Sequence, residues 1–228
     1  MTGPPGAGAR ELHEGQAAYT AFTLRGYDLA VHGINIPLFW KCPPRHMADL
    51  YERNITTEHL DIGVGTGRLI ARCSPTARRK VTLVDLNRAS LAHTARRLAD
   101  CDVTVCRADI LQPLPLPPES HGSAGLNFLL HCLPGGMDTK ARALDHAARC
   151  VRPGGRVFGS TVLASGLPVS AGGRLLMRAL NRRGVFHNTG DSLTGLREAL
   201  AARFPEHRLW THGCVAFFEG TVFEGTVG

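Results

Sequence analysis

A run of glycines beside a carboxylate is the segment of this sequence best suited to hold a ligand. It reads Asp61-Ile62-Gly63-Val64-Gly65-Thr66-Gly67 and follows a short apolar stretch that is typical of a buried strand. Glycine lets the backbone turn tightly and lets a ligand approach closely, and a helix beginning at about Arg68 would add unpaired N–H groups. Nicotinamide and flavin enzymes use the spacing G-x-G-x-x-G, whereas this loop has G-x-G-x-G preceded by an acid.

Three further polar residues stand at or just beyond the ends of predicted strands. Asp85 closes the apolar run 81–84, and a carboxylate at a strand end can accept hydrogen bonds from both hydroxyls of a cis-diol. Asp109 follows the predicted strand 102–106, and His131 follows the apolar run 124–130. Because ligands bind at the carboxyl ends of parallel strands, and because imidazole titrates near neutral pH, His131 is the candidate catalytic base.

Predicted strands and helices alternate along the chain, and this order would bring these residues to one edge of a sheet. Strands are predicted over 59–64, 80–85, 102–106, 124–130 and 156–163, and helices over 88–100, 139–150 and 192–203. Such alternation predicts an α/β fold with a doubly wound, mostly parallel sheet that helices cover on both faces. Two last apolar runs, 208–211 and 215–218, predict an antiparallel C-terminal hairpin, which completes a seven-stranded sheet.

The chain is expected to divide into three parts. Residues 1–15 are rich in Gly, Pro and Ala and predict a disordered tail, and residues 16–57 predict an N-terminal helical cap. Residues 58–228 form the main domain, in which 166–190 interrupt the alternation as an insertion on the substrate side. Tyr27 and Trp40 of the cap, and His187 of the insertion, are candidates to line the pocket of the acceptor substrate.

Composition narrows the functional classes. The net charge is +7, but the arginines are scattered and the densest basic run, 78–80, has no interleaved aromatics, so a solvated surface is favoured over nucleic-acid binding. The seven cysteines have irregular spacing and no C-x-x-C, which predicts reduced thiols, no metal site and a cytoplasmic protein. No apolar run is long enough to span a membrane, and a homo-oligomer stays open.

Five ordered motifs resemble the class I, Rossmann-like S-adenosylmethionine-dependent methyltransferases. They comprise the loop 61–67, the strand and acid 81–87, the segment 107–110, the fourth strand with its loop 125–136, and the turn 151–157. The resemblance implies S-adenosylmethionine as cofactor and S-adenosylhomocysteine as product. It implies that Asp61 and the amides of Gly63, Gly65, Thr66 and Gly67 hold the amino-acid end of the cofactor. By the same resemblance Asp85 binds the ribose and Leu86 the adenine face, Asp109 and Ile110 read the adenine edge, and Asn127 lies under the sulfonium.

The acceptor is inferred by elimination. Enzymes that methylate amino groups of DNA bases resemble one another in an (Asn/Asp)-Pro-Pro motif after the fourth strand, and cytosine-C5 enzymes in a Pro-Cys nucleophile; neither occurs here. A small-molecule substrate remains, and a looser likeness to small bacterial and fungal enzymes of secondary metabolism rests on 39–43, 59–65 and 181–186. Two alternatives stay open: an enzyme of the same fold that uses the sulfonium for a non-methylating reaction such as cyclisation, and an NAD(P)-dependent oxidoreductase.

Overall fold

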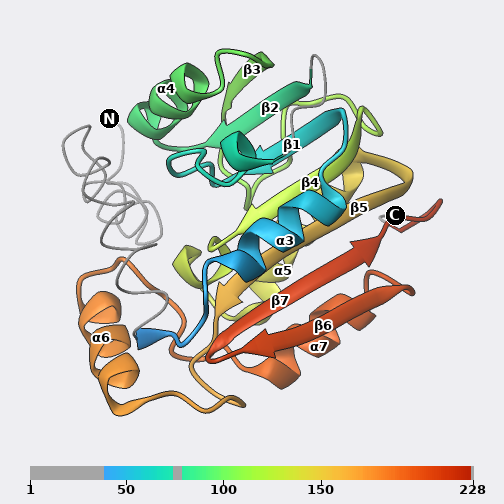
Figure 1. The fold of residues 1–228 in the computed structure, drawn as a ribbon. Coiled ribbons are helices and arrows are strands. Elements are labelled where there is room, and N and C mark those ends of the chain that lie inside the picture. Colours follow the sequence, from blue (N-terminus) through green and yellow to red (C-terminus); the bar gives the residue numbers. More distant parts are fainter. Residues whose placement is uncertain (1–38, 74–78, 227–228) are drawn as a thin grey trace, which may run out of the picture.

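A seven-stranded sheet forms the centre of the protein (Figure 1), in a computed structural model that describes residues 39–73 and 79–226. The strand order is β3-β2-β1-β4-β5-β7-β6, and only the last two neighbouring pairs, β5–β7 and β7–β6, are antiparallel. The predicted fold class, with its antiparallel C-terminal hairpin, is therefore confirmed. The strands are β1 Glu58–Ile62, β2 Lys80–Asp85, β3 Asp102–Arg107, β4 His121–Asn127, β5 Val151–Val162, β6 His207–His212 and β7 Val215–Thr221.

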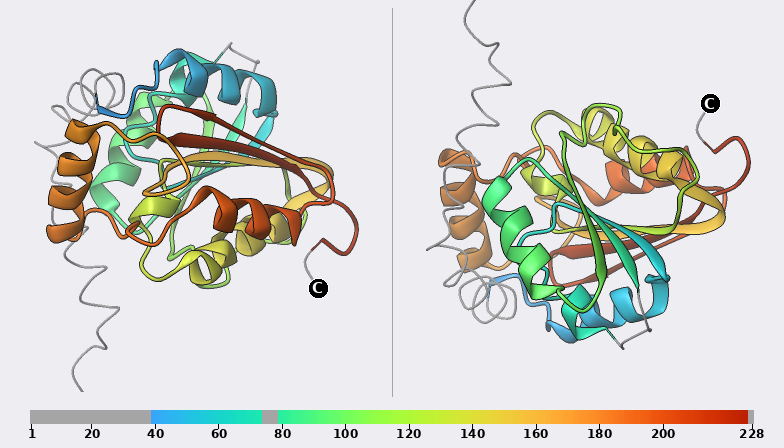
Figure 2. Two further views of the ribbon diagram at one scale, coloured as in Figure 1. Left: turned by 90° about the horizontal axis from the view of Figure 1, so that it is seen from below. Right: turned by 90° about the horizontal axis from the view of Figure 1, so that it is seen from above.

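Helices cover both faces of this sheet. Figure 2 shows α3 and α4 on one face and α5 and α7 on the other, while α6 lies beside the end of the sheet. None of the helices in the described part of the chain is long and apolar enough to cross a membrane. The helices are α3 Arg45–Asn54, α4 Arg88–Arg97, α5 Met137–Cys150, α6 Ala171–Arg182 and α7 Leu193–Ala201, with 3-10 turns η2 Ile70–Arg72 and η3 Leu130–Cys132.

The core has two halves, one on each face of the sheet. Leu83 of β2 packs in the cluster that includes residues of α3 and α4, whereas its neighbour Val84 packs in the cluster beneath α5 and α7. Successive side chains of a strand point to opposite faces, so a strand covered on both faces must be apolar throughout. This is why β2 could be recognised from Val81, Leu83 and Val84, which pack on both faces.

The strands β4 and β5 differ from their predicted bounds. β4 ends at Asn127 because Phe128 has a φ of 51°, which takes the chain out of the strand and into η3. β5 begins at Val151 and absorbs the segment that was expected to be a turn, through a register shift opposite His121 and Ser123. A Cβ on Gly155 would overlap the backbone there, so this irregularity requires glycine.

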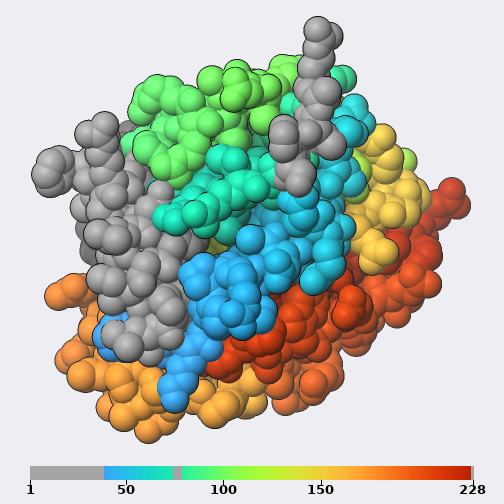
Figure 3. Space-filling model, viewed as in Figure 1, coloured from blue at the N-terminus to red at the C-terminus, as the bar shows by residue number. Residues whose placement is uncertain are grey.

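The N-terminal part of the described chain is bound firmly to the sheet. Arg53 and Asn54, at the end of α3, both donate hydrogen bonds to Oε1 of Glu219 on β7, at 2.7 and 2.9 Å. In Figure 3, α3 covers the face between the residues of the first strands and those of the C-terminal hairpin. The expected tail 1–15 and most of the expected cap, including Tyr27, lie outside the described residues.

Candidate functional site

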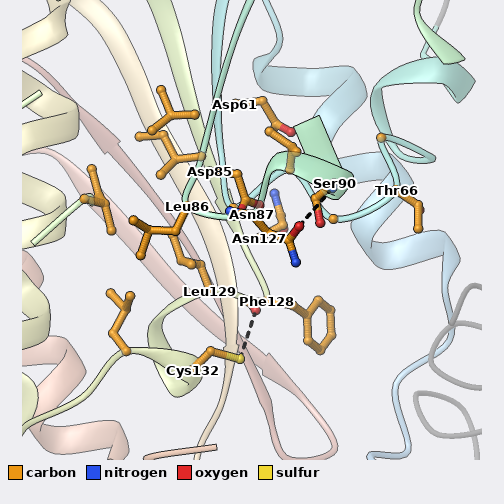
Figure 4. Close-up of a pocket in the computed structure, with 18 of the residues that line it drawn as sticks. Asp61, Thr66, Asp85, Leu86, Asn87, Ser90, Asn127, Phe128, Leu129 and Cys132 are labelled. Atoms are coloured by element: carbon orange, nitrogen blue, oxygen red, sulfur yellow. Dashed lines mark hydrogen bonds between the residues drawn. The ribbon is translucent and has the colours of Figure 1, made fainter. Parts of the chain in front are cut away.

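A cavity lies at the carboxyl ends of β1, β2 and β4, the edge of the sheet where open α/β folds bind ligands. Every residue that the resemblance assigned to the cofactor lines it, and Tyr51 and His187 line it as well. In Figure 4 the carboxylates lie toward one end of the cavity, with Phe128 and Cys132 toward the other. The assigned residues are Asp61, Gly63, Gly65, Thr66, Gly67, Asp85, Leu86, Asp109, Ile110 and Asn127.

The glycine loop adopts a backbone that other residues reach only with strain. Gly63, Gly65 and Gly67 have φ values of 70°, 52° and 67°. A side chain at Gly67 would collide with Thr94 of α4, so that glycine permits close packing of the loop on the helix. Nothing lies within 4 Å of the position of a Cβ on Gly65, which leaves open space on the cavity side of the loop.

Asp61 is buried and held from outside its own strand. The hydroxyl of Tyr51, on α3, donates a 2.6 Å hydrogen bond to its Oδ1, and His59 Nε2 lies 3.7 Å from the same oxygen. Burial and the neighbouring carboxylate raise the pKa of Tyr51 well above its usual value, so the phenol remains a donor. His59 is held in turn by Ser123, whose Oγ is 2.9 Å from its Nδ1. Sequence reasoning missed Tyr51 because only the tertiary fold brings α3 to the end of β1.

Asp85 sits at the end of β2 with its orientation set by the next turn. Its Oδ1 accepts a hydrogen bond from the backbone N–H of Asn87 at 2.8 Å. Asn87 in turn caps α4, since its Oδ1 accepts from the N–H groups of Ala89 and Ser90. Burial raises the pKa of Asp85 to about 6, against the opposing effect of the backbone N–H groups of Asn87 and Gly65. The carboxylate is thus charged at neutral pH but poorly hydrated, which favours hydroxyl donors from a ligand.

Two further polar residues of the cavity are fixed by neighbours. Asp109 accepts a 2.9 Å hydrogen bond from the N–H of Leu111, so it also stabilises the turn after β3. Asn127 accepts from the Ser160 hydroxyl at 2.9 Å. Its Nδ2 is buried without a hydrogen bond of normal geometry among the described residues, and its side chain interacts with the Tyr51 phenol, where it opposes the rise in the pKa of Tyr51.

The far end of the cavity is formed by the loop after β4 and the segment 184–187. Val185 and His187 line the cavity, whereas Phe186 between them is buried against His131 and Trp40, with ring centroids 4.3 and 6.0 Å apart. The imidazole of His187 is half-buried and accepts or donates no hydrogen bond within the described chain. Its backbone N–H donates to the carbonyl of His131 at 2.8 Å.

The structure does not support His131 as the catalytic base. Its ring does not line the described cavity but is buried beneath it, and its Nδ1 accepts from the N–H of Val162 at 3.2 Å and lies 3.3 Å from Thr161 Oγ1. Burial lowers the pKa of His131 to about 3, so the ring is a weak proton acceptor. η3 turns this side chain inward, which its position one residue beyond an apolar run could not reveal.

Trp40 also does not lie in the cavity, where it was expected from the sequence. It is 3% exposed, packs in the core and does not line the described cavity. Its carbonyl accepts a hydrogen bond from the N–H of Cys214, so it joins the N-terminal segment to the β6–β7 turn. Cys132 does line the cavity, and burial raises the pKa of its thiol to about 12, which keeps it protonated.

All seven cysteines fall within the described residues and are free. The same residues contain no group of three His, Cys, Asp or Glu side chains arranged to hold a metal ion.

Comparisons with known proteins agree with this geometry. A protein family described as a methyltransferase domain matches residues 60–155. Demethylluteothin O-methyltransferase of Streptomyces thioluteus is 50% identical over 210 residues, covering 92% of this chain and 91% of that protein. The physcion biosynthesis cluster O-methyltransferase of Aspergillus chevalieri is 34% identical over 207 residues, covering 90% and 93%.

A solved structure extends the agreement to the fold. The S-adenosylmethionine-dependent methyltransferase of Thermotoga maritima superposes with a TM-score of 0.65 at 17% identity, covering 92% of this chain and 99% of that one. The relatives leave no support for an oxidoreductase. The chain therefore belongs to the S-adenosylmethionine-dependent methyltransferases of Rossmann-like fold.

Proposed function

We propose that the enzyme transfers the methyl group to a hydroxyl oxygen of a small-molecule acceptor in the biosynthesis of a secondary metabolite. The observation that carries this proposal is one cavity that runs from the glycine loop and Asp85 to His187. A donor and a small acceptor can be aligned side by side in such a space. Oxygen is favoured because both relatives described above are named as O-methyltransferases.

The residues of the cavity fit S-adenosylmethionine. Asp61 has one oxygen held by Tyr51 and leaves Oδ2 for an ammonium group, beside loop amides that Gly65 keeps accessible. Asp85, buried and charged, suits the two hydroxyls of a ribose, and Leu86 and Ile110 supply apolar contact for an adenine ring. The Nδ2 of Asn127 offers a further donor. When bound, the cofactor supplies a methyl group already activated by its sulfonium.

We place the proton acceptor at His187 rather than His131. A hydroxyl must lose its proton as the oxygen attacks, and a base has to lie within hydrogen-bond reach of it. His187 lines the cavity with a ring that takes no hydrogen bond from the described chain, and its backbone is fixed to His131. Alignment of donor and acceptor, together with this proton transfer, is the main contribution required of the protein.

The test uses the substrate named for the Streptomyces relative. The protein is incubated with S-adenosylmethionine and demethylluteothin, and products are analysed by mass spectrometry. We expect a singly methylated product together with S-adenosylhomocysteine, and we expect His187→Gln to reduce turnover strongly while S-adenosylhomocysteine binding is retained. Turnover by His187→Gln at the wild-type rate would remove the proposed base. Consumption of S-adenosylmethionine to a cyclised product instead would overturn methyl transfer to oxygen.

We further propose that nucleic acid is not a substrate and that the enzyme works in the cytoplasm. The arginines are dispersed, and the seven cysteines are all free, as suits a reducing compartment. The oligomeric state stays a separate prediction, for which light scattering of the purified protein is the direct measurement.

A further inference from the structure

A buried ion pair lies directly behind the acceptor end of the cavity. Lys140 of α5 is fully buried, and its Nζ donates to both carboxylate oxygens of Asp191, at 2.8 and 2.7 Å. The same Nζ donates to the backbone carbonyl of His187 at 2.8 Å, so all three of its protons have acceptors. Asp191 is joined to the segment just after β5 as well, because its carbonyl accepts from the N–H groups of Ala164 and Ser165.

The segment that carries His187 runs between this ion pair and α6, and hydrogen bonds of Asn188 fix it there. Asn188 is fully buried, and its side chain donates to the carbonyl of Val162 and accepts from Asn181. Its backbone N–H donates to Asn181 Oδ1, and the N–H of Asp191 donates to its carbonyl. The segment therefore has one register relative to the sheet.

That register decides which side chains face the cavity. Gly184, Val185 and His187 line it, whereas Phe186 and Asn188 are buried. A displacement of this segment would move His187 away from its place in the cavity wall. Lys140 binds the carbonyl of His187 itself, so it acts at the residue whose direction matters most.

Stability does not account for this ion pair. A buried pair loses the hydration of both charges, and an apolar pair of similar volume is often as stable. Buried polar groups do, however, specify one arrangement against others, because any other register leaves them without partners. The Lys140–Asp191 pair is buried, and Lys140 also donates to the cavity segment at the carbonyl of His187.

We propose that Lys140 and Asp191 are positioning residues that hold the segment 184–188 in the register that presents His187 to the acceptor. This inference rests on the proposed role of His187, which it deepens. Neither residue lines the cavity, so the pair acts through the segment and not on the cofactor.

The experiment replaces the ion pair by an apolar pair, in K140M/D191L. Asp145 and Arg203 provide a control, because Asp145 lies on the same helix α5 and forms a 2.6 Å ion pair with Arg203, just beyond α7, and neither residue lines the cavity. The control variant is D145L/R203M. Three quantities are measured for each protein: S-adenosylhomocysteine affinity by calorimetry, the imidazole ¹⁵N signals of His187 in the S-adenosylhomocysteine complex, and kcat with demethylluteothin.

We expect K140M/D191L to bind S-adenosylhomocysteine within about twofold of wild type. The His187 signals should shift or split, and kcat should fall by roughly tenfold or more because a small misplacement of a catalytic group has large effects. D145L/R203M should leave the His187 signals and kcat unchanged. Wild-type His187 signals and kcat in K140M/D191L would overturn the proposal.

Two provisions keep the result decisive. Where K140M/D191L does not fold, D191N is measured instead, because it keeps the shape of Asp191. It should change the His187 signals and kcat in the same direction. Unchanged His187 signals and kcat in D191N would also overturn the proposal. The His187 signals do not require turnover, so they test the positioning role even where demethylluteothin is not methylated. Loss of the proposed base and loss of the positioning role are thereby distinguished.

Discussion

Asp85, the residue proposed to bind the ribose, shows how burial changes the properties of a single carboxyl group. Its pKa is raised to about 6, so the group passes from carboxylate to carboxylic acid within the range where the protein can be studied. The carboxylate accepts hydrogen bonds at both oxygens and carries a charge that strengthens them, whereas protonation turns one oxygen into a donor. The strength of cofactor binding should therefore depend on pH at this one residue.

We expect the affinity for S-adenosylhomocysteine to fall as the pH is lowered from 7 to 5, by up to about tenfold for each pH unit below the pKa. Asp85→Asn should weaken binding by about 1.5–3 kcal/mol at pH 7, the scale of hydrogen bonds to a charged group, and should abolish this pH dependence. Calorimetry over this range makes both measurements. An Asp85→Asn variant with wild-type affinity would refute the ribose assignment.

Unfolding does not explain the same trend. A carboxyl group whose pKa is higher in the folded than in the unfolded protein makes the ligand-free fold more stable as the pH falls toward the unfolded value. Stability from this group therefore increases while affinity decreases. The two effects have opposite signs and can be separated in one titration.

At the scale of elements, the β6–β7 turn requires a glycine because another segment packs closely against it, and the pattern of apolar residues in the strands does not predict this contact. Gly213 has a φ of 59°, and a Cβ there would overlap the carbonyl oxygen of Trp40. The N-terminal segment thus passes against the hairpin at its tip, where Cys214 also donates to the Trp40 carbonyl.

Gly213→Ala should lower the free energy of unfolding by about 1–3 kcal/mol, because it adds both a left-handed backbone penalty and an overlap. Urea denaturation gives this difference. Gly225→Ala is the control, since Gly225 has a φ of 76° but nothing within 4 Å of its Cβ position, and it should cost less. Equal losses in the two variants would show that the contact with Trp40 contributes nothing.

For the whole molecule, cofactor binding and folding are linked, since the cavity draws residues from α3, β1, β2, β4 and the segment 184–187. A ligand at about 100 times its Kd stabilises the fold by about 2.7 kcal/mol. For a protein of this size we expect S-adenosylhomocysteine to raise Tm by about 5–10 °C, while NAD leaves Tm unchanged. Differential scanning fluorimetry gives the comparison, and a larger shift with NAD would contradict the cofactor assignment.

The sequence by itself determined the sheet, its parallel core and the end of the cavity lined by the glycine loop and the aspartates. These features depend on local patterns: apolar runs form strands that are buried on both faces, and acids or glycines directly after them must gather at one edge. Asp61, Asp85 and Asp109 accordingly line the cavity together.

Only the tertiary structure decided the acceptor end. Tyr51 reaches Asp61 from another element, His131 turns inward through a 3-10 turn, and Lys140 meets Asp191 across 51 residues of sequence. The direction of a side chain after a strand depends on backbone dihedral angles and on packing partners far away in the chain. No local spacing encodes those partners, so residue types alone could not distinguish His187 in the cavity from His131 beneath it.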